Sequence, residues 1–424
     1  MKKVMFFAFA TFAVSAAMAF PSPKISAIQI ESTKGLNARL TVNYTLSEPA
    51  IVLCDIVTNV TGTAEGDDFA SIGPERLLTF SGDIGHKVEA GSGKSFVWYA
   101  GADWPSNKLD EATMRVRLTA YPTNRPPDYL VVDLAKDAKE RHRYYASAAD
   151  IPGFPESDVY RTQKLVMRFI RAKNIPWTMG AFSENEKSDQ RQCELPHTVR
   201  LRSNYWISVF EMTKGQYAHF AGNAANQTNV MPLSNDAPFN AVRGASTLYP
   251  ALPSDSSHLG KLYLRTGIRF DLPSEAQWEY AAKAGHGEHL WGDGTEMTEF
   301  NLTNGIGRAV YKGVVDTIGK LQRPGSFKPN DWGLYDMMGN VCEYCLDWWQ
   351  QDISWNSEGV VNADGENYAD GSAVGGTAYR VARGGYYSSD FLHIRPAYRY
   401  SAKVGPNNWT EGMGYRVVTE FGIK

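Results

Sequence analysis

The sequence predicts two domains: an all-β sandwich in the first third of the chain, followed by an α+β domain with little regular secondary structure. Three observations lead to this fold class. The chain has 424 residues, more than one ordinary domain contains. Its first part holds short runs of β-branched and aromatic residues that alternate in polarity. Its remainder shows few helical or strand periodicities and is rich in glycine and aromatic residues.

The composition favours folded domains and excludes some partners. Hydrophobic residues make up 43% of the chain and charged residues 21%, which argues against disorder. The formal net charge is −3, so no basic surplus is available for nucleic acid. Four cysteines in a chain of this length do not form a disulfide scaffold.

The N-terminus is typical of a secretory signal peptide. Lys2 and Lys3 form a positively charged start, residues 4–16 form an apolar run, and residues 17–19 are the A-x-A-like cleavage site. The apolar run is shorter than the roughly 20 residues that a spanning helix needs. We therefore expect residues 1–19 to be removed, leaving a secreted or periplasmic protein without an integral membrane segment.

Residues 20–134 are predicted to form the sandwich. About seven short strands in this length, separated by Gly, Pro, Asn, Asp and Ser clusters, favour an immunoglobulin- or fibronectin-like fold. No catalytic constellation is evident in this part. The strand-forming runs are ISAIQIES, NARLTVNYTL, AIVLCDIV, RLLTFSG, SFVWYA and MRVRLTAYP.

A polar junction, residues 135–158, is predicted to link the sandwich to the second domain at residues 159–424. Two helices are expected in the second domain. One covers residues 213–221. The other covers residues 274–284, where Ser274 and Gln277 have the spacing of a capping box.

Seven motifs in the second domain occur in a fixed order. Together they resemble the formylglycine-generating enzyme family, also called the sulfatase-modifying factor family, over residues 165–418. The resemblance implies an α+β fold related to C-type lectins, with low regular secondary structure. The motifs are MG (179–180), YWISVFEMTKGQYAHF (205–220), LPSEAQWEYAAKAG (272–285), WGD (291–293), GLYDMMGNVCEYCLDWW (333–349), ARGGYY (382–387) and GYRVV (414–418).

The resemblance also implies a copper-dependent oxidation of a substrate cysteine, and the residues for it are missing. Active members hold copper(I) with two cysteines after the GG motif, because this soft ion prefers thiolates. Those positions fall on Ser389 and Ile394. A serine hydroxyl is a hard donor and isoleucine has no donor, so we expect copper to be absent.

Three further positions of the implied site also differ. Tyr386 stands where the family has serine, Asp390 where it has histidine, and Cys342 where it has the tryptophan of GNVWEW. His393 lies beside the second lost cysteine and could act as a polar contact or a general base. We therefore assign no catalytic residue in this degenerate site.

Cys342 and Cys345 form a single C-x-x-C pair. Without a second pair or a matching histidine pair, this is a weak zinc signal. The sequence favours a structural role, either as a local disulfide or as two buried thiols that fill the space of the lost tryptophan.

The implied calcium site survives better. The resemblance places its ligands at Asp336, Gly339, Val341 and Glu343, where two carboxylates would balance the charge of the ion. A second calcium site corresponds only partly to Asn301 and Leu302, because its acidic ligand has no counterpart. Calcium is thus the expected cofactor, and copper and iron are not.

The remaining motif residues are interpreted as architecture or as groove lining. We expect three arginines, Arg383, Arg399 and Arg416, to tie loops together through carboxylates and carbonyl groups. Aromatic residues are expected to line the remaining groove: Tyr386, Tyr387, Phe391, Tyr398, Tyr400 and Trp409.

The sequence therefore favours a secreted, non-catalytic, calcium-stabilised module that binds a peptide, a protein or a glycan, while enzyme activity stays undecided. One alternative is a sulfatase-modifying oxidase that converts a substrate cysteine to formylglycine. The other is a non-haem iron enzyme of the same superfamily. Those relatives take histidines from an extra helical domain, and no H-x-x-x-H helix is evident here.

Overall fold

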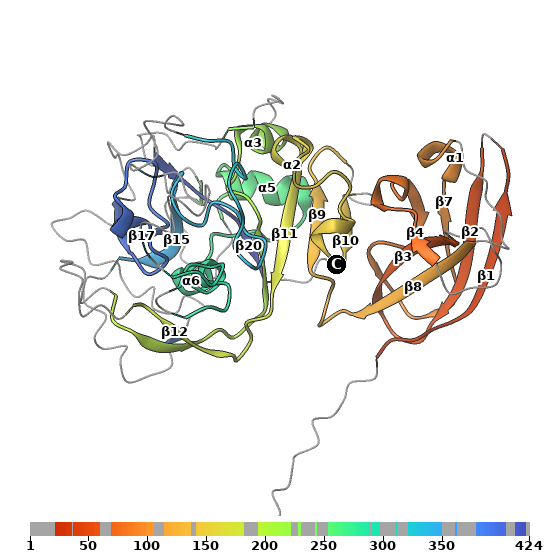
Figure 1. The fold of residues 1–424 in the computed structure, drawn as a ribbon, viewed down its shortest axis with the longest axis horizontal. Helices are drawn as coiled ribbons and strands as arrows, with labels where there is room; N and C mark the ends of the chain where they lie inside the picture. The colour runs from red at the N-terminus through yellow and green to blue at the C-terminus, as the bar shows by residue number, and fades with distance from the viewer. Residues whose placement is uncertain are drawn as a thin grey trace, which may run out of the picture.

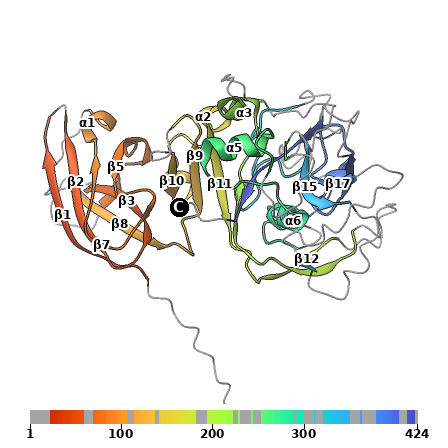
Figure 2. The same ribbon diagram turned by 180° about the vertical axis from the view of Figure 1, so that it is seen from behind.

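A computed structural model shows two β-rich lobes joined side by side (Figures 1 and 2). None of the helices in the described part of the chain has the length and apolar character that crossing a membrane requires. The structure describes residues 22–35, 37–59, 69–105, 114–136, 141–181, 194–221, 228–229, 242–243, 253–287, 290–296, 298, 311, 321–349, 361–362, 379–403 and 412–420.

The N-terminal lobe consists of two antiparallel sheets, ordered β1-β2-β7-β5 and β4-β3-β6, with β8 paired to β3. Side chains alternate along β2, where Leu40, Val42, Tyr44 and Leu46 are buried, and one apolar cluster joins them to residues of β3 and β7. This confirms a β-rich region; the immunoglobulin- or fibronectin-like topology stays a prediction. The elements are β1 (Ile25–Thr33), β2 (Arg39–Leu46), β3 (Ala50–Asn59), β4 (Phe69–Ser71), η1 (Pro74–Arg76), β5 (Phe80–Gly82), β6 (Lys87–Val88), β7 (Gly91–Trp98), α1 (Ala100–Asp103) and β8 (Met114–Pro122).

The C-terminal lobe combines three small sheets with four short α-helices and two 3-10 helices in its described part. The sheets are ordered β10-β9-β11-β14-β20, β12-β13-β16 and β18-β17-β15-β19. The elements are β9 (Tyr129–Asp133), β10 (His142–Tyr145), η2 (Ala148–Asp150), α2 (Val159–Thr162), β11 (Lys164–Ile170), β12 (Pro176–Met179), β13 (His197–Arg200), β14 (Tyr205–Ser208), α3 (Lys214–Ala221), α5 (His258–Thr266), α6 (Glu275–Lys283), β15 (Cys342–Trp348), β16 (Val361–Asn362), β17 (Tyr379–Arg383), η4 (Phe391–Ile394), β18 (Tyr400–Lys403), β19 (Met413–Gly414) and β20 (Val418–Thr419).

The sheets do not follow the predicted boundaries at 134 and 158. Strand β9 pairs antiparallel with β11, and β10 pairs with β9, so both belong to the sheet of the C-terminal lobe. The predicted linker, residues 135–158, therefore contains an edge strand of that sheet. The sequence does not predict this strand, because the residues before HRYY are polar and basic. An edge strand needs only one apolar face and therefore leaves a weak pattern.

Helix α6 forms as the capping box predicts and positions the site. The Ser274 side chain accepts from the Gln277 amide, and the Gln277 side chain accepts from the Ser274 amide. Trp278 and Ala281 are fully buried in a cluster with Leu334 and Val381. The helix is thus anchored between β17 and the loop of residues 333–341, here called the motif loop.

The two lobes are in direct contact. Ile51 of β3 lies in the same apolar cluster as Tyr144 and Trp206 of the C-terminal lobe. The Tyr144 amide donates to the Gly85 carbonyl at 3.0 Å. The Arg143 guanidinium donates to the carbonyl groups of Leu77 and Leu78 and lies 4.7 Å from the centre of the Phe80 ring. Strand β10 therefore docks the N-terminal lobe.

Candidate functional site

The copper pocket that the family resemblance implies begins at the end of β17, where two glycines reverse the chain. Gly384 and Gly385 have φ angles of 88° and 68°. A Cβ atom at Gly385 would lie 2.8 Å from the carbonyl oxygen of His393, and one at Gly384 would lie 3.0 Å from Trp278. Only glycine fits this close turn, which holds the following segment against α6 and η4.

The two positions of the missing copper cysteines are buried and engaged. The Ser389 hydroxyl accepts from the Tyr386 amide at 3.0 Å and shares a 2.7 Å hydrogen bond with the Tyr400 hydroxyl. Ser389 is 4% exposed. Ile394 is fully buried in an apolar cluster with Trp291, Tyr311 and Met338. Neither position offers a soft donor, and Ile394 instead contributes to the core.

An aromatic wall lies beside these positions. The rings of Tyr398 and Tyr400 meet edge to face at 4.7 Å, and the His393 ring lies 4.7 Å from that of Tyr398. The rings of Tyr386 and Tyr387 meet at 5.4 Å. Both of these tyrosines are half-buried, so part of the wall faces solvent.

The polar residues of the pocket are the more exposed ones. The His393 Nδ1 lies 3.9 Å from the Asp390 carboxylate, and their side chains are 41% and 61% exposed. Leu392, which lies between them in the sequence and belongs to η4, is 49% exposed. The structure therefore brings His393 and Asp390 together at the rim, whereas Ser389 and Ile394 lie beneath it.

Cys342 lies under the same pocket as a neutral thiol. Burial raises its pKa far above the usual range, and the neighbouring Glu343 carboxylate raises it further. Burial likewise raises the pKa of Tyr400, with Cys342 as a second cause. Copper(I) needs thiolates. One buried, protonated thiol does not replace the two cysteines.

The C-x-x-C pair consists of two free cysteines. Both lie on β15, and positions three apart on a strand point to opposite faces. Cys342 joins the cluster around Trp206, and Cys345 joins the cluster around Trp278. Of the two structural alternatives, the structure confirms the buried thiols.

We expect Cys342 and Cys345 to resist alkylation in the native protein, because both are 1% exposed or less and burial raises the pKa of each thiol. The measurement is peptide mass mapping after treatment with iodoacetamide, before and after unfolding in guanidinium. Burial raises the pKa of the half-buried Cys54 as well, so Cys54 serves as an internal comparison for exposure alone. A peptide that links Cys342 to Cys345 would contradict the prediction.

The predicted calcium ligands fit an ion only in part. Asp336 is a buried carboxylate in a left-handed turn, with φ 55°, and it accepts from the Gly325 amide at 2.5 Å. Gly339 and Val341 follow in the same loop. Both oxygens of Glu343 instead accept from Arg416, at 2.6 Å each, and one also accepts from the Trp278 indole at 2.7 Å. Asp336 fits a hard cation, but Glu343 does not.

Glu211 is a third buried carboxylate beside this loop, and sequence reasoning missed it. It accepts from the Asn340 side chain at 2.7 Å and from the Val341 amide at 3.3 Å. Burial raises its pKa well above the usual value, and Asp336 and Glu343 add to the shift. Within the described residues no group of three or more His, Cys, Asp or Glu side chains could hold a metal ion.

The pKa of Asp336 predicts how stability changes with pH. Burial raises this pKa from 3.8 to about 6, so the folded state is stabilised by the protonated form of Asp336. This contribution to stability is complete below pH 3.8 and is lost as the pH rises through about 6. Between about pH 5 and 7.5 the free energy of unfolding should fall by about 1–2 kcal/mol more in the parent than in Asp336→Asn. Denaturant melts in the presence of a chelator measure this difference. Parallel pH profiles of the two proteins would contradict it.

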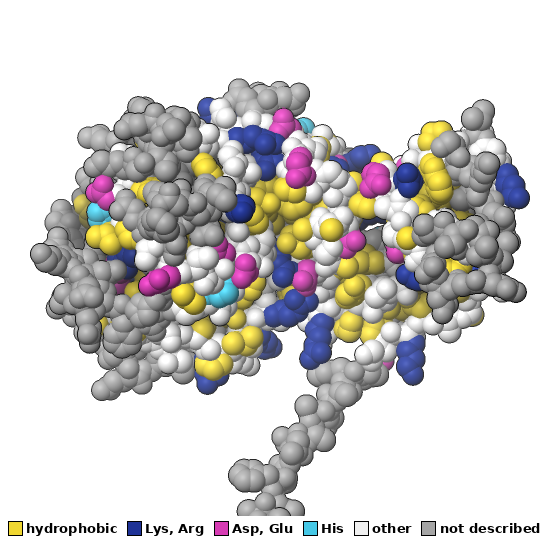
Figure 3. Space-filling model, in the orientation of Figure 1, with side chains coloured by type: hydrophobic (Ala, Val, Ile, Leu, Met, Phe, Trp, Pro, Cys, Tyr) yellow, Lys and Arg dark blue, Asp and Glu magenta, His cyan; other side chains and the backbone are white. Residues whose placement is uncertain are grey.

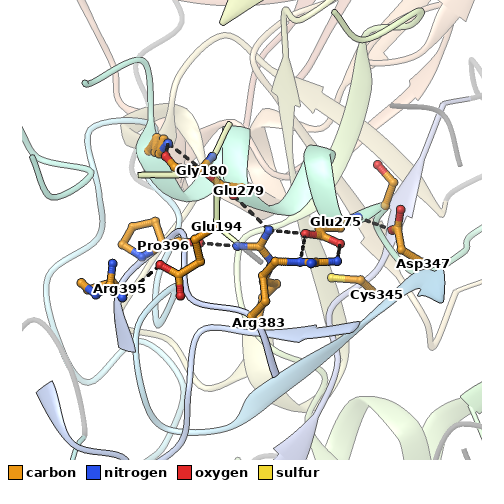
Figure 4. A network of polar contacts seen from close by, with 12 residues as sticks. Gly180, Glu194, Glu275, Glu279, Cys345, Asp347, Arg383, Arg395 and Pro396 are labelled. Atoms are coloured by element: carbon orange, nitrogen blue, oxygen red, sulfur yellow. Dashed lines mark hydrogen bonds and ion pairs between the residues drawn. The ribbon is translucent and has the colours of Figure 1, made fainter. Parts of the chain in front are cut away.

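Arg383 lies at the centre of a second buried network (Figure 4). Its guanidinium contacts Glu275 at 2.5 Å and Glu279 at 3.0 Å, both on α6, and donates to the Pro396 carbonyl at 2.8 Å. Arg399 contacts Glu275 at 2.5 Å. As the sequence predicts, Arg383 and Arg399 connect separate segments through carboxylates and a carbonyl group.

Some predicted positions lie outside the described residues: Asn301, Leu302 and Trp409. Sequence reasoning also missed Glu194, which contacts Arg395 at 3.1 Å in the network of Figure 4. An acidic residue in a loop gives no periodic signal, and only its three-dimensional partner reveals it.

A comparison with protein families matches residues 170–421 to the model described as Sulfatase-modifying factor enzyme 1-like domain. A formylglycine-generating enzyme of Streptomyces coelicolor is 29% identical over 296 residues, covering 59% of this chain and 88% of that protein. The serine/threonine-protein kinase pkn1 of Chlamydia pneumoniae is 29% identical over 243 residues, covering 55% of this chain. The chain spans only 36% of the length of this kinase.

Two solved structures are similar to part of this chain. The structure of PvdO from Pseudomonas aeruginosa has 23% identity and a TM-score of 0.43, and covers 60% of this chain and 94% of that chain. Treponema denticola variable protein 1 has 21% identity and a TM-score of 0.41, and covers 61% of this chain and 96% of that chain. Since the family model spans more than half of the sequence, this chain belongs to the family of proteins with a sulfatase-modifying factor enzyme 1-like domain.

Proposed function

We propose that this protein is a secreted, non-catalytic binding module for a peptide or a glycan. The observation that carries the proposal is the environment of Ser389 and Ile394, the two positions that hold copper in active members of the family. Ser389 is tied to Tyr400, and Ile394 is part of the apolar core. Because both soft ligands are replaced while Tyr386 and Tyr387 beside them stay partly exposed, this site supports recognition better than oxidation.

The rim of the pocket provides the means of recognition. Tyr386 and Tyr387 offer partly exposed rings, which can pack on a sugar face or on an apolar side chain. Asp390 and His393 add exposed polar groups on the same rim. The glycine turn and α6 hold these side chains on rigid elements, so little ordering is needed on binding.

Three features of the proposal rest on the sequence. Residues 1–19 would direct secretion to the periplasm or the exterior. The N-terminal lobe would be an immunoglobulin- or fibronectin-like spacer. Calcium would stabilise the motif loop through Asp336 and the carbonyl groups of Gly339 and Val341, without the Glu343 side chain.

Copper loading tests the absence of catalysis. The purified protein and the variant Ser389→Cys/Ile394→Cys are incubated with copper(I), desalted and analysed for metal. We expect no stoichiometric copper in the parent and no aldehyde on cysteine-containing peptides, because both soft ligands are missing. One copper per parent chain, or peptide oxidation by it, would overturn the proposal in favour of a sulfatase-modifying oxidase. Stoichiometric iron, measured in the same way, would favour the iron enzyme.

A binding screen tests the positive part. Libraries of peptides and oligosaccharides are offered to the parent and to Tyr387→Ala/His393→Ala, both exchanges being on the rim. Ligands that bind the parent and lose affinity for the variant would support the pocket as the site. A parent that binds none of them, or a variant that binds them equally, would refute it.

A further inference from the structure

Strand β1 forms an open edge of the N-terminal lobe. It runs over nine residues, Ile25–Thr33, and pairs with β2 on one side. On its other side no strand of the described part of the chain pairs with it. Figures 1 and 2 show β1 at the end of this lobe that is turned away from the C-terminal lobe, and in Figure 3 this lobe extends to one side of the molecule. A long, accessible edge of this kind can pair with a further strand.

The core face of β1 is apolar and only partly covered. Ile30 pairs in register with Val42 of β2, whose side chain is fully buried, so Ile30 lies on the core face of the sheet. Its side chain is nevertheless 38% exposed, and that of Ile28 is 44% exposed. Single exposed apolar residues are common on protein surfaces, but two on an open strand edge form an apolar surface that a partner strand could bury.

A bulge divides β1 into two short regular parts. The register shifts within residues 26–29, where Ala27 has a φ of 50°. Because the bulge adds one residue, the alternation of faces is offset by one position across it. Ile25 pairs with Leu46, which is buried in the core, and therefore lies on the core face together with Ile30. Each part of the strand thus carries an isoleucine on the core side.

Two charged side chains lie on the outer face beside these isoleucines. Lys24 precedes Ile25, and Glu31 follows Ile30, so both charges are on the face opposite to the core. Lys24 continues the ladder with β2, since its carbonyl accepts from the Ser47 amide at 3.0 Å. Both charged side chains are exposed, and neither forms an ion pair with another residue that the structure describes. The edge therefore carries one unpaired positive and one unpaired negative charge.

We propose that a second copy of this chain pairs with the edge of β1, with the two strands antiparallel about a two-fold axis that passes through the centre of the bulge. In this register Lys24 of each copy lies opposite Glu31 of the other, on the outer face. Ile25 of each copy likewise lies opposite Ile30 of the other, on the core face. Residues directly opposite each other in an antiparallel pair have Cβ atoms about 5 Å apart, which is close enough for ion pairs and apolar contacts.

The edge is complementary to itself, which favours a second copy over a different protein. Each of these contacts occurs twice because of the two-fold symmetry. The bulges of the two strands face each other, so the extra residue of one matches that of the other and the ladder stays in register on both sides. Since each copy uses the same surface, the pairing closes as a dimer. The pocket of Ser389 belongs to the other lobe, so this interface is independent of the function proposed above.

Sedimentation equilibrium of the full secreted chain, at concentrations from about 1 to about 200 µM, tests the proposal. We expect a reversible equilibrium between monomer and dimer, because a single strand pair buries less surface than a standard interface and gives a weak dimer. Glu31→Lys places lysines opposite each other at both ends of the pair and should raise the dissociation constant at least about tenfold. The matched control is Glu75→Lys, the same exchange at an exposed glutamate of η1 in the same lobe, and it should leave the constant unchanged.

The charge swap Lys24→Glu/Glu31→Lys distinguishes a lost strand pair from a damaged lobe. It restores opposite charges between the two copies and should return the dissociation constant to within about threefold of the parent value. A variant that had lost its fold could not be rescued by a second charge reversal. A double variant as weak as Glu31→Lys, or a Glu31→Lys variant as tight as the parent, would overturn the proposal. A parent that stays monomeric at about 200 µM would assign the edge to a different protein and overturn it as well.

Discussion

Replacing Arg416 with methionine is expected to lower the free energy of unfolding by about 3–5 kcal/mol, because it leaves a buried carboxylate without its partner. Arg416 and Glu343 are both fully buried and are joined by two hydrogen bonds of 2.6 Å. The guanidinium also donates to the carbonyl groups of Ser208 and Tyr335. Burial disfavours the charged guanidinium, yet Glu343 outweighs this and holds the pKa of Arg416 above its usual value.

Equilibrium unfolding in urea measures this effect. The exposed Arg125→Met is the matched control and should change stability by no more than about 0.5 kcal/mol. A loss below about 1 kcal/mol would show that the pair is not essential.

Arg383→Met is expected to have a similar effect, also about 3–5 kcal/mol, through the network on α6. Arg383 is fully buried between Glu275 and Glu279. Burial raises the pKa of Glu275, but Arg399 and Arg383 together lower it below its usual value. Without the Arg383 guanidinium, the buried carboxylates of Glu275 and Glu279 would have less positive charge beside them.

A double-mutant cycle separates this pair from the rest of the network. Arg383→Met, Glu275→Gln and their combination are compared by the same urea unfolding. The combined loss should be smaller than the sum of the two single losses by about 1–3 kcal/mol, because the neutral glutamine no longer requires the guanidinium. Additive losses would mean that Arg383 and Glu275 do not interact energetically.

The parts of the fold that the sequence predicts are those with local causes. The capping box of Ser274 and Gln277 determines where α6 begins, and its spacing is visible in the chain. Helix α5 was missed, although Ser257 caps its start and Gly267 ends it in a left-handed turn. Leu259, Leu262 and Thr266 of this helix are buried and are spaced as on one helix face, so a local signal for α5 is present in the sequence beside the caps.

The parts that could not be predicted depend on partners distant in sequence. Strand β10 is recognisable only through its pairing with β9. Similarly, Glu211 is meaningful only beside Asn340, which lies 129 positions further along the chain. The candidate site shows the same division. The loss of copper ligands follows from residue types at Ser389 and Ile394, whereas the hydrogen bond from Ser389 to Tyr400 requires the structure.

The membership of β9 and β10 in the C-terminal sheet has a practical consequence for dissecting the protein. A recombinant fragment that begins at residue 159 would lack both strands and would leave β11 as a bare edge. Bare edges with apolar residues invite intermolecular pairing, so such a fragment should precipitate. A cut placed before Tyr129, within residues 123–126, would keep the sheet whole. Limited digestion with a protease should for the same reason spare the two strands themselves, Tyr129–Asp133 and His142–Tyr145.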